Sequence, residues 1–186
     1  MVNKVRHATG ADKVDLVGWS QGGGILPNYY INVMGQGDKV HQLVGIAPSN
    51  HGTTMSNLVF FRAFLPPLTM PLYDTVTYLA PGLTQQAISD RMAGIVYGHG
   101  DTRPGIKYTN IVSEFDEVVT PYTRQFLQGP NVSNIVLQDG CDKDWANHLS
   151  QPYSKRTWLF VLNALSPATA KPVPCFRVDP FWPGVR

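Results

Sequence analysis

The spacing of apolar residues changes along the chain between helical and strand periods, and these changes mark out its first elements. Residues 2–9 form a helical pattern that Gly10 stops, and residues 13–17 form a short apolar strand. From Ser20 onward, apolar residues recur at helical spacing as far as Gly35. The opening of the chain therefore predicts a helix, a strand, a sharp turn and a second helix.

Further along the chain, apolar strands alternate with longer connecting segments. A second strand is predicted over residues 40–47, a third over 106–113 and a fourth over 132–138, and residues 153–165 have the spacing of a helix. Polar, turn-forming residues follow the carboxyl ends of these strands. Strands joined by crossover segments predict an α/β fold with a mostly parallel sheet, whose functional site lies at the carboxyl edge of the strands.

A long insertion at about residues 55–98 separates the second and third strands. Its stretch 59–73 is rich in Phe, Leu, Met and Pro and lies on the side where the predicted site opens. We expect this stretch to be either the wall or lid of an acyl-chain pocket, or a cap packed on the core. With a length of 186 residues, the pattern predicts a single domain over residues 1–186 that carries this insertion.

Composition narrows the functional classes. The apolar share is 43% and the charged share 15%, so the chain should fold; a formal charge of +2 with scattered Lys and Arg offers no surface for nucleic acid. No segment has the length and apolarity of a transmembrane helix, and residues 1–10 lack the apolar stretch of a signal peptide. Two cysteines, Cys141 and Cys175, are compatible with one disulfide or with two free thiols.

The strongest chemical signal is a GxSxG motif from Gly18 to Gly22, with Ser20 at its centre. The motif lies between a predicted strand and a predicted helix, where a nucleophilic serine occupies a strained turn and glycines leave room for the close approach of strand and helix. The backbone N–H of Gln21 begins the new helix and is the predicted hydrogen-bond donor to an oxyanion. The alternative is a glycine-rich turn whose serine has no chemical role.

A nucleophilic serine needs a histidine to accept its proton and a carboxylate to hold that histidine. In this fold the chain order is serine, acid, histidine, and His148 is the one histidine that follows a plausible acid on the third strand. Asp116 is the preferred acid, because it follows that strand at the edge where Ser20 emerges. Its rivals are Glu114, Glu117 and, more weakly, Asp101.

A metal site is the competing interpretation of the last loop. Its ligands would be Cys141, Asp142, Asp144 and His148, but their spacing matches no zinc motif of defined geometry. A short acidic loop is more often solvated, so we expect no metal there.

Several separate motifs, in the right order, resemble one enzyme family. They are residues 15–23 (DLVGWSQGG), 27–30 (PNYY), 44–53 (VGIAPSNHGT), 116–122 (DEVVTPY), 129–132 (GPNV) and 137–139 (LQD). Together they extend over nearly the whole chain, which resembles the secreted bacterial class 2 triacylglycerol lipases of the α/β-hydrolase superfamily.

The resemblance implies an extracellular lipase or esterase with Ser20, Asp116 and His148 as its triad, no cofactor, and a disulfide between Cys141 and Cys175. Ser20 would attack the ester carbonyl, His148 would pass the proton to the leaving alcohol, and water would release the acyl-enzyme. A cutinase-like polyester hydrolase or an acyltransferase would use the same triad. A folded lipase remnant without turnover is the non-enzymatic alternative.

The chain departs from the family pattern in two places. Trp19 stands where the family commonly has a histidine, which should alter the pocket beside the nucleophile. Family members also carry several strands before the nucleophile strand, including a loop that supplies the second oxyanion donor, whereas this sequence begins at the helix just before that strand. We therefore expect the strand at residues 13–17 to be an apolar edge, covered by self-association, by a preceding segment or by a rearranged segment of this chain.

Overall fold

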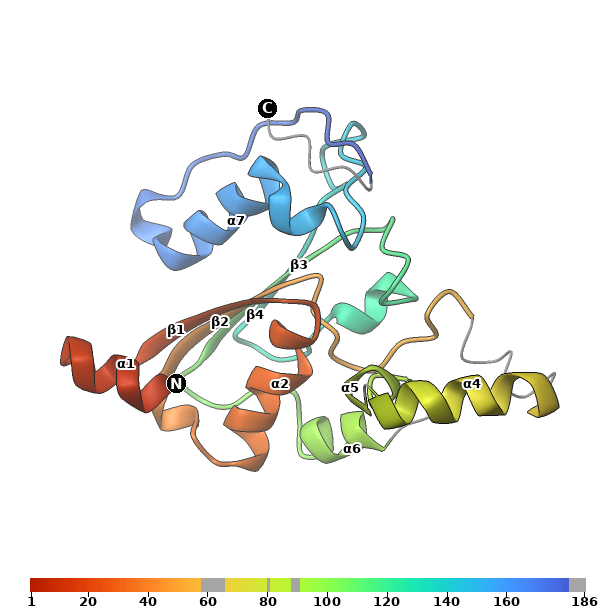
Figure 1. The fold of residues 1–186 in the computed structure, drawn as a ribbon. Helices are drawn as coiled ribbons and strands as arrows, with labels where there is room; N and C mark the ends of the chain where they lie inside the picture. Colours follow the sequence, from red (N-terminus) through yellow and green to blue (C-terminus); the bar gives the residue numbers. More distant parts are fainter. Residues whose placement is uncertain (58–65, 80, 88–90, 181–186) are drawn as a thin grey trace.

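A four-stranded parallel sheet forms the centre of the protein (Figure 1). The computed structural model describes residues 1–57, 66–79, 81–87 and 91–180. The strands are β1 (Val14–Trp19), β2 (Val40–Ile46), β3 (Lys107–Val112) and β4 (Val132–Val136), and they lie in this order across the sheet. The predicted parallel α/β fold is confirmed, and so are all four predicted strands, apart from small differences at their ends.

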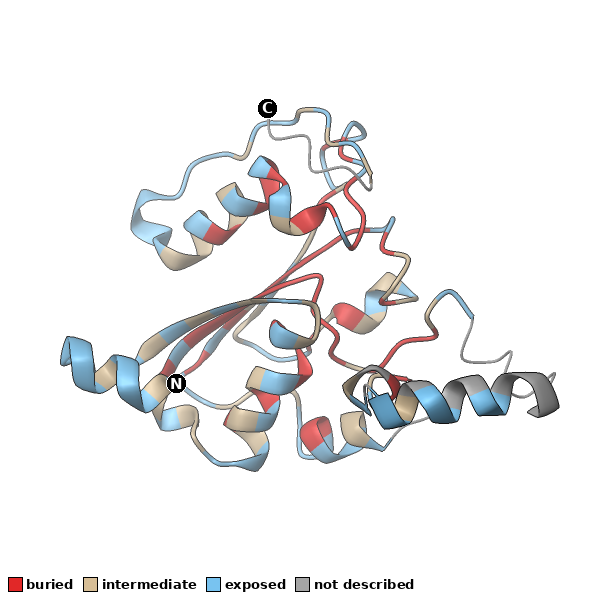
Figure 2. Ribbon diagram, viewed as in Figure 1, coloured by how far each residue is buried: buried red, intermediate tan, exposed pale blue. Residues whose placement is uncertain are grey.

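Helices cover both faces of the sheet: several short helices on one face and a longer helix on the other. On one face lie α2 (Ile25–Asn28), the π-helix η2 (Tyr29–Val33) and α6 (Met92–Tyr97), while α7 (Lys155–Leu165) covers the other face (Figure 1). Helix α1 (Val2–Thr9) flanks β1 and buries none of its residues (Figure 2). The short 3-10 helices are η1 (Ser20–Gly22), η3 (Gly37–Lys39), η4 (Tyr122–Gln125), η5 (Gln151–Tyr153) and η6 (Pro167–Thr169).

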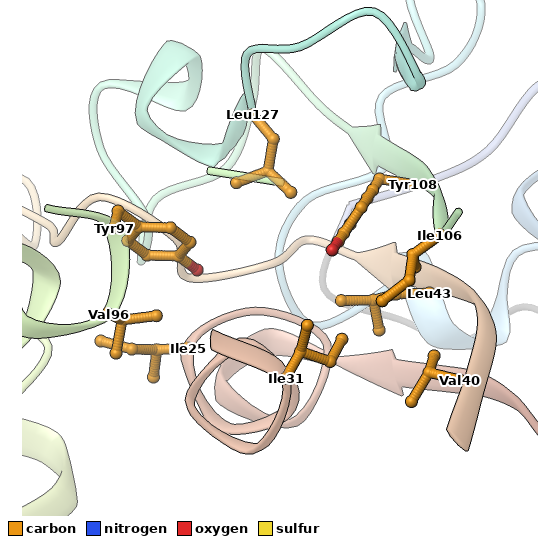
Figure 3. Close-up of a cluster of buried hydrophobic side chains, with 9 residues drawn as sticks. All are labelled: Ile25, Ile31, Val40, Leu43, Val96, Tyr97, Ile106, Tyr108 and Leu127. Carbon is orange, nitrogen blue, oxygen red and sulfur yellow. The ribbon is translucent and has the colours of Figure 1, made fainter. Parts of the chain in front are cut away.

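Side chains alternate along the strands and so divide the core into two clusters. Leu43 of β2 faces the layer of α2 and α6, whereas the next residue, Val44, faces Val161 of α7. The first cluster is shown in Figure 3 and contains Ile25, Ile31, Val40, Leu43, Val96, Tyr97, Ile106, Tyr108 and Leu127. Both faces of β2 and β3 are therefore buried, which fixes the register of the strands that carry the site loops.

The prediction of one regular helix after Ser20 is wrong in detail. The chain forms the 3-10 turn η1, then α2, then the π-helix η2. Gly24 interrupts the helix because its φ of −119° and ψ of −104° are not helical. A side chain at Gly24 would also lie 2.4 Å from the carbonyl oxygen of Ser49, so the chain packs too tightly here for any other residue.

The insertion between β2 and β3 carries helices α4 (Pro66–Leu79) and α5 (Pro81–Thr84) as well as α6. Part of the predicted lid or cap stretch, residues 59–65, lies outside the described residues. The exposed side chains of α4 include Tyr78 and Leu79. None of the helices in the described ranges is both long and apolar enough to cross a bilayer.

The C-terminal tail is tied back to the loop that follows β4. Cys141 and Cys175 form a disulfide, as the family resemblance implied, with a Cα–Cα distance of 5.1 Å. A backbone bridge also joins Asp144 to Val178. The tail therefore holds the loop that leads to His148.

Candidate active site

The serine at the end of β1 occupies a strained turn. Ser20 has a φ of 56°, which is a left-handed conformation uncommon outside glycine. A Cβ at Gly18 would lie 2.0 Å from the carbonyl oxygen of Gly22, and one at Gly23 would lie 2.3 Å from that of Gly18. Strand and helix thus approach as closely as the motif predicted, but at Gly22 itself a side chain would have open space.

The side chains of Ser20, His148 and Asp116 meet at the carboxyl edge of the sheet. The Nε2 atom of His148 lies 2.9 Å from Oγ of Ser20, and its Nδ1 atom lies 2.8 Å from Oδ2 of Asp116. The side chains of His148 and Asp116 are 3% and 0% exposed, so water does not compete for their contact. The structure therefore brings together the three residues that the sequence singled out.

Four hydrogen-bond donors fix the orientation of the Asp116 carboxylate. Oδ1 accepts from the backbone N–H groups of Val118 and Val119, at 2.9 and 2.7 Å. Oδ2 accepts from Nε2 of Gln125 at 3.1 Å as well as from His148. A carboxylate can only accept, so Nδ1 of His148 carries its hydrogen and the lone pair of Nε2 faces the Ser20 hydroxyl. This arrangement can accept the proton of the serine.

The rival acids have other partners. Glu114 is exposed, and Asp101 receives a 3.1 Å contact from Nε2 of His51. Glu117 contacts His148, but through the backbone: its Oε2 accepts the N–H of His148 at 3.2 Å. Of the four candidate acids, Asp116 alone contacts the His148 ring.

The remaining histidines lie elsewhere. His41 pairs with Asp15 on the surface, and His7 and His99 are exposed. This distribution agrees with the choice of His148 from chain order.

A buried ion pair anchors the loop that carries His148. Oδ2 of Asp144 lies 3.1 Å from Nη1 of Arg156 in α7, and Oδ1 accepts the N–H of Ala146 at 3.0 Å. Burial raises the pKa of Asp144, and the hydrogen bonds from Ala146 and Arg156 oppose that rise. Ser113, at the end of β3, also donates to the carbonyl of Ala146. The loop is therefore attached to both β3 and α7.

The residues of the competing metal interpretation have other partners. Cys141 is bonded to Cys175, Asp144 pairs with Arg156, and His148 contacts Ser20 and Asp116. Within the described ranges, no group of three or more His, Cys, Asp or Glu residues is arranged to hold a metal ion.

The serine turn is joined to the insertion. Nε2 of Gln21 donates to the carbonyl of Gly82 in α5 at 2.9 Å. Ser49, whose N–H donates to the carbonyl of Ser20, also donates through its hydroxyl to Gln86 at 2.7 Å. The backbone N–H of Gln21 lies in the first turn of η1, where such groups have no partner inside the helix. Its role as oxyanion donor stays a prediction.

The sequence did not reveal the supporting role of three side chains, although Glu117 was named as a rival acid and Trp19 as a departure from the family pattern. Gln125 orients Asp116, Glu117 holds the backbone of His148, and the indole N–H of Trp19 donates to the carbonyl of His148 at 3.0 Å. The sequence places Trp19 next to Ser20 and Glu117 next to Asp116, whereas Gln125 lies nine residues after Asp116; spacing alone does not reveal their contacts.

Comparisons with known proteins give a structural relationship. A scan of protein families and a search of curated proteins find no match. The solved structure of Aspergillus fumigatus lipase B is similar at 22% identity and a TM-score of 0.67, over 93% of this chain. Bacillus licheniformis lipase BlEst2 in its mature form matches at 16% identity and a TM-score of 0.47, over 73% of this chain and 61% of that one.

The match to Aspergillus fumigatus lipase B covers only part of that protein. The chain spans 40% of the length of Aspergillus fumigatus lipase B. Four parallel strands, the strained serine turn after β1 and this structural match agree. The chain therefore has an α/β-hydrolase fold.

Proposed function

We propose that this protein is a serine ester hydrolase of the lipase or carboxylesterase type. The observation that carries the proposal is the line of contacts from Ser20 through His148 to the buried Asp116, with distances of 2.9 and 2.8 Å. The strained turn at Ser20 and the tautomer of His148 support the same conclusion, because both are what a nucleophilic serine requires.

In the proposed reaction, Oγ of Ser20 attacks the ester carbonyl while Nε2 of His148 takes its proton. The Gln21 N–H stabilises the oxyanion of the tetrahedral intermediate, and a second donor is needed beside it. His148 then protonates the leaving alcohol, and an acyl group remains on Ser20. Water, activated by His148, releases the acid and restores the serine.

We propose acyl esters of medium or long chain as substrates, with the helical insertion as the wall of the acyl pocket. Membership of the class 2 triacylglycerol lipases belongs to this proposal, and so does secretion, with which the Cys141–Cys175 disulfide is compatible. We also retain the proposal of one domain over residues 1–186.

Ester turnover tests the proposed function. A series of p-nitrophenyl esters from acetate to palmitate should be hydrolysed, with a preference for the longer acyl chains, and Ser20→Ala should abolish turnover. Repeating the assay with an alcohol acceptor separates a hydrolase from an acyltransferase. A folded wild-type protein that hydrolyses no member of the series would favour the non-catalytic remnant.

The sheet edge at β1 carries a separate proposal of self-association. β1 lies at one end of the sheet, and its Val17 and Trp19 side chains are each 41% exposed. An apolar edge strand of this kind offers unpaired backbone groups to another chain. Size-exclusion chromatography with light scattering should show a dimer or larger species, and a monomer at all concentrations would contradict the proposal.

A further inference from the structure

The backbone N–H and C=O groups of His148 are both hydrogen-bonded to side chains. It lies in a turn between β4 and η5, outside any helix or strand, and its residue exposure is 3%. Buried backbone N–H and C=O groups need hydrogen-bond partners, and a misplacement of a catalytic ring by about 1 Å can cost about 10²-fold in rate. What pairs with this peptide backbone therefore bears on the reaction.

The N–H side of His148 is held by Glu117. Its Oε2 accepts the backbone N–H of His148 at 3.2 Å, and its Oε1 accepts from Nδ2 of Asn147 at 3.1 Å. Asn147 in turn exchanges two hydrogen bonds with Ser150, at 2.9 and 3.0 Å. One carboxylate thus joins the acid loop to two successive residues of the histidine loop.

The C=O side of His148 is held by Trp19. The indole Nε1–H donates to the carbonyl of His148 at 3.0 Å, and the two rings lie with centroids 5.3 Å apart. Trp19 is itself fixed by β1, where it pairs in register with Ile46 of β2.

Glu117 and Trp19 are each a chain neighbour of a triad residue. Trp19 immediately precedes Ser20, and Glu117 immediately follows Asp116. The backbone of the base is thus attached to the chain neighbours of the nucleophile and of the acid. We infer that Glu117 and Trp19 are positioning residues that hold the His148 backbone, so that its ring spans Ser20 and Asp116. This inference rests on the proposed function of the site.

The key variant is Glu117→Gln, which keeps the shape of the side chain. It replaces one acceptor oxygen by a donor NH₂, so one of the two hydrogen bonds to residue 117, from Nδ2 of Asn147 or from the N–H of His148, is lost. We expect kcat for p-nitrophenyl butyrate to fall about 10- to 100-fold with little change in KM, and the rate of Ser20 labelling by a fluorophosphonate to fall in parallel. Trp19→Phe removes the other hydrogen bond and should lower kcat in the same way.

Matched controls separate positioning from loss of charge or of an indole. Glu114→Gln removes a carboxylate from the same loop at an exposed position, and Trp158→Phe removes an indole N–H that donates to Pro152. Both controls should keep the wild-type kcat. All assays are run well below the thermal midpoint of each variant, so that unfolding does not contribute.

Introducing Glu117→Gln into His148→Ala distinguishes action through the histidine from a general structural effect. A residue that works through His148 should cause no further loss of labelling rate when His148 is absent. An equal fold-loss in both backgrounds, or a wild-type kcat in Glu117→Gln, would overturn the inference. A folded wild-type protein inert toward both ester and probe would instead overturn the proposed function, and the roles of both residues with it; the controls would then be inert as well.

Discussion

Of the three histidine–carboxylate pairs among the described residues, the two that are not on the surface have similar lengths but different surroundings. His148 lies 2.8 Å from Asp116, and His51 lies 3.1 Å from Asp101. The second nitrogen of His148 faces the Ser20 hydroxyl, whereas the ring of His51 packs against Tyr97 with centroids 4.6 Å apart. The side chains of His148 and Asp116 are 3% and 0% exposed, against 30% and 12% for those of His51 and Asp101. The first pair is a candidate for catalysis because burial and a third group, the Ser20 hydroxyl, accompany it.

The first test compares the two histidines directly. His148→Ala should lower kcat for ester hydrolysis by about 10⁴-fold or more, because the proton of Ser20 then has no acceptor. His51→Ala removes the same ring from the other pair and should leave kcat within about threefold. The contacts of His51 with Tyr97 and Asp101 contribute to stability and transfer no proton to or from Ser20. Steady-state kinetics of both variants give the answer, and equal losses would show that the pairs do not differ as we argue.

The two carboxylates provide the second test. Asp116→Asn should lower kcat by about 10⁴-fold, because the amide favours the wrong tautomer of His148. Asp101→Asn should keep kcat but lower the free energy of unfolding by about 1 kcal/mol, because Asp101 accepts from both His51 and the N–H of Gln128. Steady-state kinetics measure kcat of both variants, and urea unfolding measures their free energies of unfolding. A large loss of kcat in Asp101→Asn would show that the His51–Asp101 pair takes part in the reaction, which would contradict our assignment.

The disulfide between Cys141 and Cys175 holds the loop that leads to His148, the histidine of the first pair. Replacing Cys141 and Cys175 together by serine should lower the free energy of unfolding by about 2–5 kcal/mol, since the bond closes a loop between residues separated by 34 positions. Urea unfolding of the oxidised protein and of the double variant measures this difference. The folded double variant should still be labelled on Ser20 by a fluorophosphonate at low temperature, because the ion pair of Asp144 and Arg156 still anchors the histidine loop. A difference below about 0.5 kcal/mol would show that the tail does not brace this loop.

The smallest expected effect concerns Tyr97, the partner of His51. Burial raises the pKa of Tyr97 well above its ordinary value, and its hydroxyl donates to Asn50 at 2.9 Å. The folded state therefore keeps this proton to higher pH than the unfolded state, which releases it near pH 10. Stability contributed by this difference is present below about pH 10 and is lost as the pH rises further.

Tyr97→Phe should make the decline of stability above about pH 10 less steep. It should not remove the decline entirely, because burial also raises the pKa of Tyr108. Urea midpoints between pH 8 and about 11 measure this slope for both proteins. An unchanged slope would contradict the assignment to Tyr97.

The sequence predicted the elements that depend on local patterns. The strands around Ser20 and Asp116, the glycine-stopped helix at residues 2–9 and the chain order of Ser20, Asp116 and His148 all agree with the structure. These features follow from apolar periodicity and from the rule that parallel strands end at one edge.

Other features depend on contacts between distant segments and could not be predicted from spacing. At the break, Gly24 packs closely against the backbone of Ser49, 25 positions away, and the hydrogen bond of Glu117 to the His148 backbone joins residues 31 positions apart. Glu117 was considered as a rival acid, and its position beside the histidine was right, but its contact is with the backbone. A sequence pattern gives the type of residue at an edge of the sheet, and tertiary packing decides which atom it meets.

The most direct measurement of the central claim is the reaction of the folded protein with a fluorophosphonate, followed by peptide mass spectrometry. We predict one phosphonyl group per chain, attached to Ser20, absent in Ser20→Ala and formed far more slowly in His148→Ala. A folded protein that takes up no label, or that is labelled on Ser20 at the same rate without His148, would contradict it.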